Sequence, residues 1–302
     1  MARIEVSNQK ELAEALSASA PGDFIALRAG DFEVNRLQLP NHSLKLVGAG
    51  MNETRLTAMR GAAMWAKGGY GQPTELTIGD VTLRGNGAAE DNGGLLKLNN
   101  LIFKGERVRF EHGTTVRGLP LSGGALFAED SWLILEGCEF VECSSSYGGA
   151  IGLRNCGQVR IRSCRFEGTE AEHGGALSSV DTVDLSIDDS SAQATDRGAL
   201  FHIEPSLFET CRFELRGLNV GGQGALLDVR YAPAVNLAVL NCRLLATHRA
   251  ELDQLALDPQ QKRDALASYA DEGINIDGTP INVRLSGLIG GANRISGNHF
   301  VD

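Results

Sequence analysis

Hydrophobic and polar residues alternate one by one in several short segments of the chain. In residues 133–140 (LILEGCEF) and 159–166 (VRIRSCRF), apolar side chains recur at every second position within each half of the segment. Alternation over four to six residues predicts β-strands that bury one face and expose the other. Residues 107–110 (RVRF) are an earlier copy of this phrase, and 211–213 (CRF) and 242–244 (CRL) close later copies.

A glycine-rich phrase recurs between these segments at a nearly constant distance. Gly-Gly-Ala followed by Leu or Ile ends at Leu126, Ile151 and Leu177, and a version with a single glycine ends at Leu200 and Leu226. The intervals are 25, 26, 23 and 26 residues. A repeat of about 25 residues with two or three short strands is too short for a propeller blade and lacks helical periodicity. The pattern therefore predicts the coils of a solenoid.

Stacked coils pair each strand in parallel with its copy, roughly 4.8 Å away. Connections between parallel strands are right-handed in nearly all proteins. We therefore predict an all-β solenoid, a single-stranded right-handed parallel β-helix. The Cys and Phe residues of the repeated phrase should form ladders inside it, and the glycines should mark corners that need a positive φ or a close backbone approach. The alternative is a β-sandwich in which the phrases recur by chance.

The open ends of a solenoid expose unpaired strands, so caps are expected there. Residues 8–11 (NQKE) resemble a capping box, and Leu12, Ala15 and Leu16 lie on one face of the helix that follows. Residues 20–23 (APGD) end this helix. The sequence thus predicts an N-terminal helical cap.

The C-terminal part departs from the repeat. Residues 247–272 are expected to form a short C-terminal helical segment that covers the edge or makes a lateral lid, with a partner-binding helix as the alternative. Strands are expected to return in residues 273–302. We predict one domain over residues 1–302, with the cap and first coil in 1–50 and the central coils in 51–246.

Two N-terminal segments carry a resemblance to a known superfamily. A short amphipathic helix followed by PGDFIALRAGDFEV (21–34) and LKLVGAG (44–50) resembles the start of pectin-lyase-like right-handed parallel β-helices. The later Gly-Gly-Ala and Cys-x-Phe phrases are similar to repeats of the same superfamily, so the resemblance covers residues 1 to about 245. It implies the fold and leaves the activity open, because that superfamily includes lyases, glycosidases, epimerases, esterases and non-catalytic scaffolds.

Composition and charge narrow the classes of partner. The net charge of −10 and the pI near 5.2 argue against a nucleic-acid partner, because such a surface repels phosphates. The sequence contains no run of 18 apolar residues that would predict a membrane span. Its N-terminus shows no apolar segment of the kind found in signal peptides. We expect a cytoplasmic protein, or one exported by a route without a Sec-type signal peptide. The six cysteines contain no CxxC pair, so we expect reduced, buried thiols rather than a zinc site.

Enzymes of this fold bind extended polymers along one outer face, where equivalent positions after each repeated Ala should form columns. The fourth position gives Glu129, Arg154, Val180, Ile203 and Val229. The fifth gives Asp130, Asn155, Asp181, Glu204 and Arg230, and the third places His202 beside Asp228. Because loop lengths vary, a shift of one residue would exchange the buried and exposed sets.

The columns define a candidate site for an acidic sugar chain. Its catalytic candidates are His202, Asp228, Arg230 and Glu204, and its substrate-binding candidates are Arg154, Asp181 and Tyr231. A His, Arg or Tyr can remove a proton next to a carboxylate, and an Arg can neutralise a uronate. A carboxylate pair such as Glu204 and Asp228 would instead suit a glycosidase. The alternative is a solvated face with cross-strand charge pairs.

Other motifs are weaker. Asp188-Asp189 and His173-Gly174 resemble motifs of polygalacturonase-like glycosidases, but they occur in the reverse order, so those roles are not carried over. We interpret His173-Gly174 as part of a corner between coils. No cofactor is evident; calcium would need carboxylates such as Asp181, Glu204 and Asp228 to converge on one ion, and no motif supports this.

Two hypotheses of function follow from the sequence. The first is a carbohydrate-active enzyme of pectin-lyase-like type that acts on a polysaccharide or glycosyl chain by elimination, hydrolysis or epimerisation. The second is a non-catalytic β-helix that binds or scaffolds a protein partner, with residues 247–272 as its contact segment.

Overall fold

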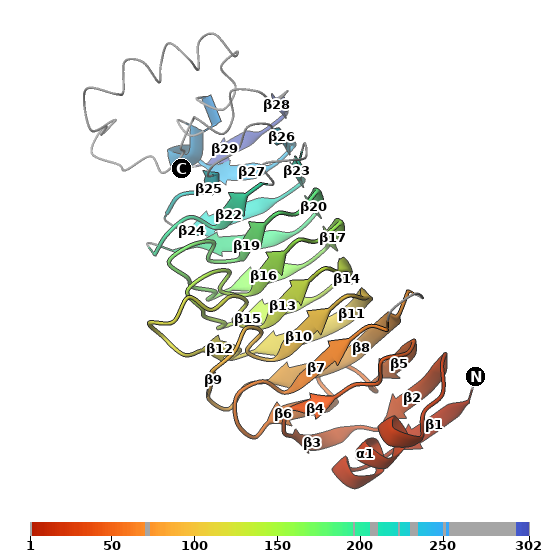
Figure 1. The fold of residues 1–302 in the computed structure, drawn as a ribbon. Coiled ribbons are helices and arrows are strands. Elements are labelled where there is room, and N and C mark those ends of the chain that lie inside the picture. The colour runs from red at the N-terminus through yellow and green to blue at the C-terminus, as the bar shows by residue number, and fades with distance from the viewer. Residues whose placement is uncertain are drawn as a thin grey trace.

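The chain winds into a parallel β-helix. The computed structural model describes residues 2–69, 73–195, 197–205, 211–222, 224–229, 235–249, 252–253 and 294–301. Strands of successive coils lie side by side from β1 at one end of the stack to β29 at the other (Figure 1), and each ladder between them is parallel. The predicted all-β solenoid is therefore confirmed, and the β-sandwich alternative is wrong.

Among the described residues, one face of the helix is a sheet of eight strands, one from each of eight successive coils. In chain order they are β4 (Leu37–Gln38), β7 (Met64–Lys67), β10 (Leu96–Asn99), β13 (Leu126–Glu129), β16 (Ile151–Arg154), β19 (Leu177–Val180), β22 (Phe201–Glu204) and β25 (Leu227–Val229). The candidate residues that the structure describes, Arg154, Asp181, His202, Glu204 and Asp228, lie on or next to this sheet.

The remaining faces form a 19-stranded sheet that is bent into two parallel ladders. The first ladder contains β1 (Arg3–Val6), β2 (Asp23–Leu27), β5 (Leu44–Val47), β8 (Glu75–Arg84), β11 (Ile102–Glu111), β14 (Trp132–Glu136), β17 (Gln158–Arg162), β20 (Asp184–Asp188), β23 (Cys211–Arg216), β26 (Val235–Leu240) and β28 (Arg294–Ser296). The second contains β3 (Gly30–Val34), β6 (Thr54–Ala58), β15 (Glu139–Val141), β18 (Arg165–Glu167), β21 (Ser191–Ala194), β24 (Asn219–Gly222), β27 (Arg243–Leu245) and β29 (His299–Val301). Strands β8 and β11 are long enough to run through both ladders. Two short strands, β9 (Ala88–Ala89) and β12 (Thr114–Thr115), pair outside these sheets.

Phenylalanine rings stack inside the solenoid as the repeated phrase predicts. The centroids of Phe110 and Phe140 are 4.8 Å apart, and those of Phe140 and Phe166 are 5.0 Å apart, with nearly parallel rings. The copy at 211–213 departs from this prediction, because Phe213 pairs with Leu185 in the first ladder while Val220 continues the column of Phe166. A Cys-x-Phe phrase fits either ladder, since both bury alternate residues.

The cysteines are buried structural residues. All six lie in the described part of the chain, and none forms a disulfide. Burial raises the pKa of the Cys143 thiol to about 12 and that of Cys156 to about 11. A thiol with such a pKa stays protonated at neutral pH and does not act as a nucleophile.

The double glycine of the repeat marks a corner where two coils come into close contact. The first glycine has a positive φ, 61° at Gly148 and 71° at Gly174. A Cβ on the second glycine Gly149 would collide with the next coil, because it would lie 2.3 Å from the carbonyl oxygen of Gly175. Gly148 and Gly149 therefore both require glycine, for different reasons, whereas a Cβ at the second glycine Gly175 would meet no atom closer than 3.3 Å.

The helix α1 (Gln9–Ala18) precedes the second strand. The side chain of Asn8 accepts a hydrogen bond from the backbone N–H of Glu11, and Glu11 accepts one from the N–H of Ser7, which is the reciprocal pattern of a capping box. Leu12, Ala15 and Leu16 are buried. After β27 a short 3-10 helix, η1 (Ala246–His248), is described, whereas most of 247–272 and the strands expected before residue 294 lie outside the described residues. None of the described helices is long and apolar enough to cross a membrane.

We predict that Gly149→Ala lowers the free energy of unfolding by about 3 kcal/mol, since the added methyl group overpacks a backbone contact. Gly221→Ala is the matched control, because a Cβ at this strand residue meets no atom within 4 Å. Urea unfolding of both variants measures the difference. Equal stability of the two variants would contradict the close-contact explanation.

We predict a pH-dependent effect for Glu214→Gln. Burial by itself raises the pKa of Glu214, but hydrogen bonds from Arg212 and Arg216 outweigh it and hold the pKa below the usual 4.5. A lowered pKa contributes stability above pH 4.5 that is lost as pH falls through the folded-state pKa. The free energy of unfolding of the variant should therefore be about 1 kcal/mol lower than that of the wild type at neutral pH. This difference should shrink in acid.

Thermal unfolding between neutral and acidic pH measures this effect. The control is Glu167→Gln, which disrupts the exposed pair of Glu167 with Arg165 and should change stability little. A loss for Glu214→Gln that is constant with pH would contradict the electrostatic explanation.

Candidate functional site

The outward side chains of the eight-stranded sheet form two columns along the solenoid. Strand register places Trp65, Lys97, Phe127, Gly152, Ser178, His202 and Asp228 in the first column. It places Lys67, Asn99, Glu129, Arg154, Val180 and Glu204 in the second. His202 therefore lies directly beside Asp228, as the sequence predicts.

The predicted columns are wrong by one residue from β22 onward. Glu204 pairs with Val180 in the column of Arg154, not in the column of Asp181. The cause is visible at the corner, where the N–H of Gly175 donates to the carbonyl oxygen of Ala199 and that of Ala176 to Leu200. Ala199 thus takes the place of the second glycine, because this copy of the repeat has one glycine fewer.

His202 is buried between two carboxylates. Its side chain has no exposed surface, its Nδ1 lies 3.1 Å from Oδ2 of Asp228, and its Nε2 lies 3.2 Å from Oε1 of Glu204. Burial by itself lowers the pKa of His202, but the hydrogen bonds and charges of Asp228 and Glu204 outweigh it, so the pKa lies above its ordinary value. The two carboxylates hold the imidazole in a fixed orientation.

A second histidine, His173, lies beside His202 and Asp228 at the corner of the preceding coil. Nδ1 of His173 lies 3.9 Å from Oδ2 of Asp228, and the rings of His173 and His202 are 5.2 Å apart. The ring of Tyr147, one coil further back, stacks on His173 at 4.9 Å. Tyr147 and His173 occupy the same corner position, directly before the double glycine, and pair through a β-bridge. Both are half-buried, so solvent reaches the group through them.

We call Tyr147, His173, His202, Glu204 and Asp228 the histidine centre. Sequence reasoning found three of its members but interpreted His173 only as a corner residue and did not select Tyr147. The available signal was the position before each Gly-Gly pair, which the coil winding brings next to the outward column. The column has a small residue beside this corner at Gly152, because a Cβ there would lie 2.1 Å from Oγ of Ser122.

The other predicted site residues lie apart from this centre or beyond the described chain. Arg154 is two strands from Glu204, approaches Glu129 at 3.6 Å and lies over the ring of Phe127. Asp181 is exposed at a corner with a φ of 55°, in line with Asp130 and Asn155. Arg230 and Tyr231 lie outside the described residues.

The described residues also show which groups can hold an ion. Ligand atoms of His173, His202 and Asp228 lie within 4.8 Å of one another, and Asp181 does not belong to this group. The carboxylates considered for calcium in the sequence are therefore not gathered as a set of three.

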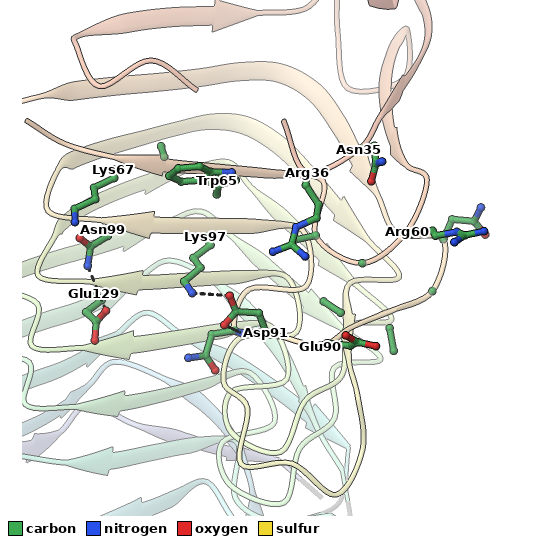
Figure 2. Close-up of a pocket in the computed structure, with 18 residues that line it drawn as sticks. Asn35, Arg36, Arg60, Trp65, Lys67, Glu90, Asp91, Lys97, Asn99 and Glu129 are labelled. Atoms are coloured by element: carbon green, nitrogen blue, oxygen red, sulfur yellow. Dashed lines mark hydrogen bonds and ion pairs between the residues drawn. The ribbon is translucent and has the colours of Figure 1, made fainter. Parts of the chain in front are cut away.

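A groove lies on the same face toward the N-terminal coils (Figure 2). It has a volume of about 1160 Å³ and lies beside the outward residues of β7 and β10. Trp65 and Lys97 project into it from the sheet, while the loop 86–92 forms one wall. Nζ of Lys97 lies 2.7 Å from Oδ2 of Asp91, which ties this wall to the sheet. Sequence reasoning did not identify this groove, because its loops lie outside the repeated phrases.

The groove is polar and carries both signs of charge around one aromatic ring. Its basic side chains are Arg36, Arg60, Lys67 and Lys97, its acidic ones are Glu90, Asp91 and Glu129, and its amides are Asn35, Asn86, Asn92 and Asn99. Trp65 and His202 stand in one column five strand spacings apart, which is about 24 Å. A ligand that reaches from Trp65 to the half-buried His173 and Tyr147 beside His202 must be an extended chain.

Comparison with known proteins supports the fold. No family model and no curated protein matches the sequence. Among solved structures, ORF18 of Geobacillus virus E2 matches with a TM-score of 0.50 and 12% identity, over 78% of this chain and 53% of the viral one. This chain thus spans about half the length of the viral protein.

Two enzymes match less well. The PL6 family alginate lyase AlyGC matches with a TM-score of 0.39 and 12% identity, over 80% of this chain and 40% of its own. The A-module of the mannuronan C-5 epimerase AlgE4 of Azotobacter vinelandii matches with a TM-score of 0.30 and 14% identity, over 80% of this chain and 78% of its own. The chain itself has a parallel β-helix fold, and the match to the viral protein supports that fold alone.

Proposed function

We propose that this chain is a carbohydrate-active protein that binds a polysaccharide along its eight-stranded sheet and acts on it at the histidine centre. The observation that carries the proposal is the convergence of Tyr147, His173, His202 and Asp228 from consecutive coils, on the face that also bears the Trp65 groove. An enzyme site needs a binding surface and a cluster of titratable groups within reach of one ligand. Both are present on one face.

Proton transfer next to a carboxylate fits this centre better than hydrolysis. A glycosidase needs one carboxylic acid and one carboxylate facing the sugar from opposite sides. Here Glu204 and Asp228 both face the same buried imidazole, and each is hydrogen-bonded to one of its ring nitrogens instead. Tyr147 is half-buried and supplies a hydroxyl group to the centre. Its phenolate form would take the proton from a carbon that is acidified by a uronate carboxyl group. In elimination the phenol would pass this proton to the leaving glycosidic oxygen, and in epimerisation a proton from solvent would reach the carbon from the opposite face. We therefore propose elimination or epimerisation of a polyuronate, with Tyr147 as the proton-exchanging group.

A non-catalytic saccharide-binding protein is the second candidate. It is favoured by the burial of His202 and by its hydrogen bonds at both ring nitrogens, which are also what a structural polar cluster requires. In that case the Trp65 groove alone would carry the function, and polymer would bind without being changed.

The role of the helix at the N-terminus is also a proposal. Helix α1 packs against β1, β2 and β3 at the end of the stack (Figure 1) and buries Leu12, Ala15 and Leu16. We infer that it caps the open end of the solenoid and keeps the first coil from pairing with another chain.

We predict that Trp65→Ala weakens polymer binding by 10-fold or more, because it removes the aromatic surface on which a sugar ring packs. Affinity electrophoresis in gels containing polyuronates of different linkage, or neutral glucans, measures the effect. Trp132→Ala is the control, since Trp132 is exposed on the other sheet and should not affect binding. Equal retardation of both variants would exclude the groove as the binding surface.

We predict that Tyr147→Phe reduces turnover of the polyuronate by 100-fold or more while binding persists, since the change removes only a hydroxyl group. Ultraviolet absorbance of unsaturated ends detects elimination, and proton NMR of the polymer detects epimerisation. Full activity of Tyr147→Phe would exclude Tyr147 as the proton-exchanging group. Binding without turnover by the wild-type chain would favour the second candidate.

A further inference from the structure

The donor atoms of the histidine centre form an arrangement that is suited to a transition-metal ion. Oδ2 of Asp228 lies 3.1 Å from Nδ1 of His202 and 3.9 Å from Nδ1 of His173, and the three ligand atoms fall within 4.8 Å of one another. Donor atoms around a four-coordinate ion with bonds of about 2.1 Å are roughly 3.4 Å apart. Side-chain rotations that move atoms on the order of 1 Å would therefore bring the three donors onto one ion.

The hydrogen bonds of His202 have the pattern of a metal-bound histidine. Its Nε2 faces Oε1 of Glu204 at 3.2 Å, while its Nδ1 faces Asp228. A histidine ligand commonly donates its second ring N–H to a carboxylate, which fixes the tautomer and leaves the other nitrogen free to coordinate. A divalent cation between Nδ1 and the carboxylate of Asp228 would take the place of the proton that these two groups share, while the N–H of Nε2 stays hydrogen-bonded to Glu204.

We propose that His173, His202 and Asp228 bind one divalent first-row transition metal of the zinc class, with Glu204 as the positioning residue that orients His202. Two imidazoles and one carboxylate are the donor set of metal sites that keep coordination positions open for a substrate or water. Calcium is disfavoured, because it takes six to eight oxygen ligands. Zn²⁺ is the probe, and Mn²⁺ and Fe²⁺ are compared in the same way.

The ligands come from three successive coils, which gives the proposed site its rigidity. Asp228 lies on β25, His202 on β22, and His173 on the corner before β19. Asp228 and His202 are almost fully buried, whereas His173 has a quarter of its side chain exposed. The ion would thus reach the site past His173 and Tyr147. This proposal concerns the same centre as the proposed function, but its test needs no saccharide, so each can fail without the other.

The experiment measures metal binding to the untagged full chain. After exchange against chelator, isothermal titration with Zn²⁺ should give one tight equivalent, and X-ray absorption at the zinc edge should show two imidazole ligands at about 2.0–2.1 Å. His173→Ala and Asp228→Ala should each lose this equivalent. Glu204→Gln should bind 10- to 100-fold more weakly, because only the partner of the ligand is changed.

The control is His112→Ala. His112 also stands directly before a glycine at a corner, and its Nδ1 pairs with Glu142 away from the centre. This variant should bind Zn²⁺ as the wild type does. Because His173 is partly exposed, His173→Gln is included as a variant that preserves size, and circular dichroism checks that each variant is folded.

Two results would overturn the proposal. The first is a wild-type chain that takes up no stoichiometric Zn²⁺, Mn²⁺ or Fe²⁺. The second is one equivalent of metal that persists in folded His173→Gln and Asp228→Ala, since the ion would then lie elsewhere.

Discussion

The stacking of one coil on the next through parallel backbone hydrogen bonds is the constraint on which the rest of this structure depends. Strand spacing is fixed near 4.8 Å, so the corners must also approach to that distance. At Gly149 the following coil lies so close that no side chain fits, whereas Ala199 is accommodated at the corresponding place two coils later. The same spacing places the rings of Phe110, Phe140 and Phe166 in van der Waals contact. Local sequence is therefore selected by contacts with a coil about 25 residues away.

This stacking also creates the chemistry of the outer face. Residues that are 26 apart in the chain, such as His202 and Asp228, become direct neighbours without any loop having to fold over them. The corner adds His173 from the side, so that three coils contribute to one group of polar atoms. Strand β22, which carries His202, pairs with β19 on one side and with β25, which carries Asp228, on the other, and a preorganised site requires such rigid supporting elements.

The face combines two different kinds of surface. The groove near Trp65 is wide and bounded by a loop, whereas the histidine centre is compact and mostly buried. Their alignment in one column follows from the straight ladder of the sheet. An extended polymer parallel to the solenoid axis is the ligand shape that can contact both surfaces.

The sequence by itself determined the fold, the alternation of buried and exposed residues, the burial of the cysteines, the N-terminal helix and the pairing of His202 with Asp228. These follow from local periodicity, which has a physical cause within one strand or one turn of helix. Only the tertiary structure decided that Phe213 belongs to a different ladder from Phe166, that Glu204 aligns with Arg154, and that His173 and Tyr147 join the centre. Register between coils depends on hydrogen bonds across a full repeat and on loops of unequal length. The loss of one glycine before Ala199 moved that register by one residue. An alternating pattern fits either register equally well, so the sequence alone does not choose between them.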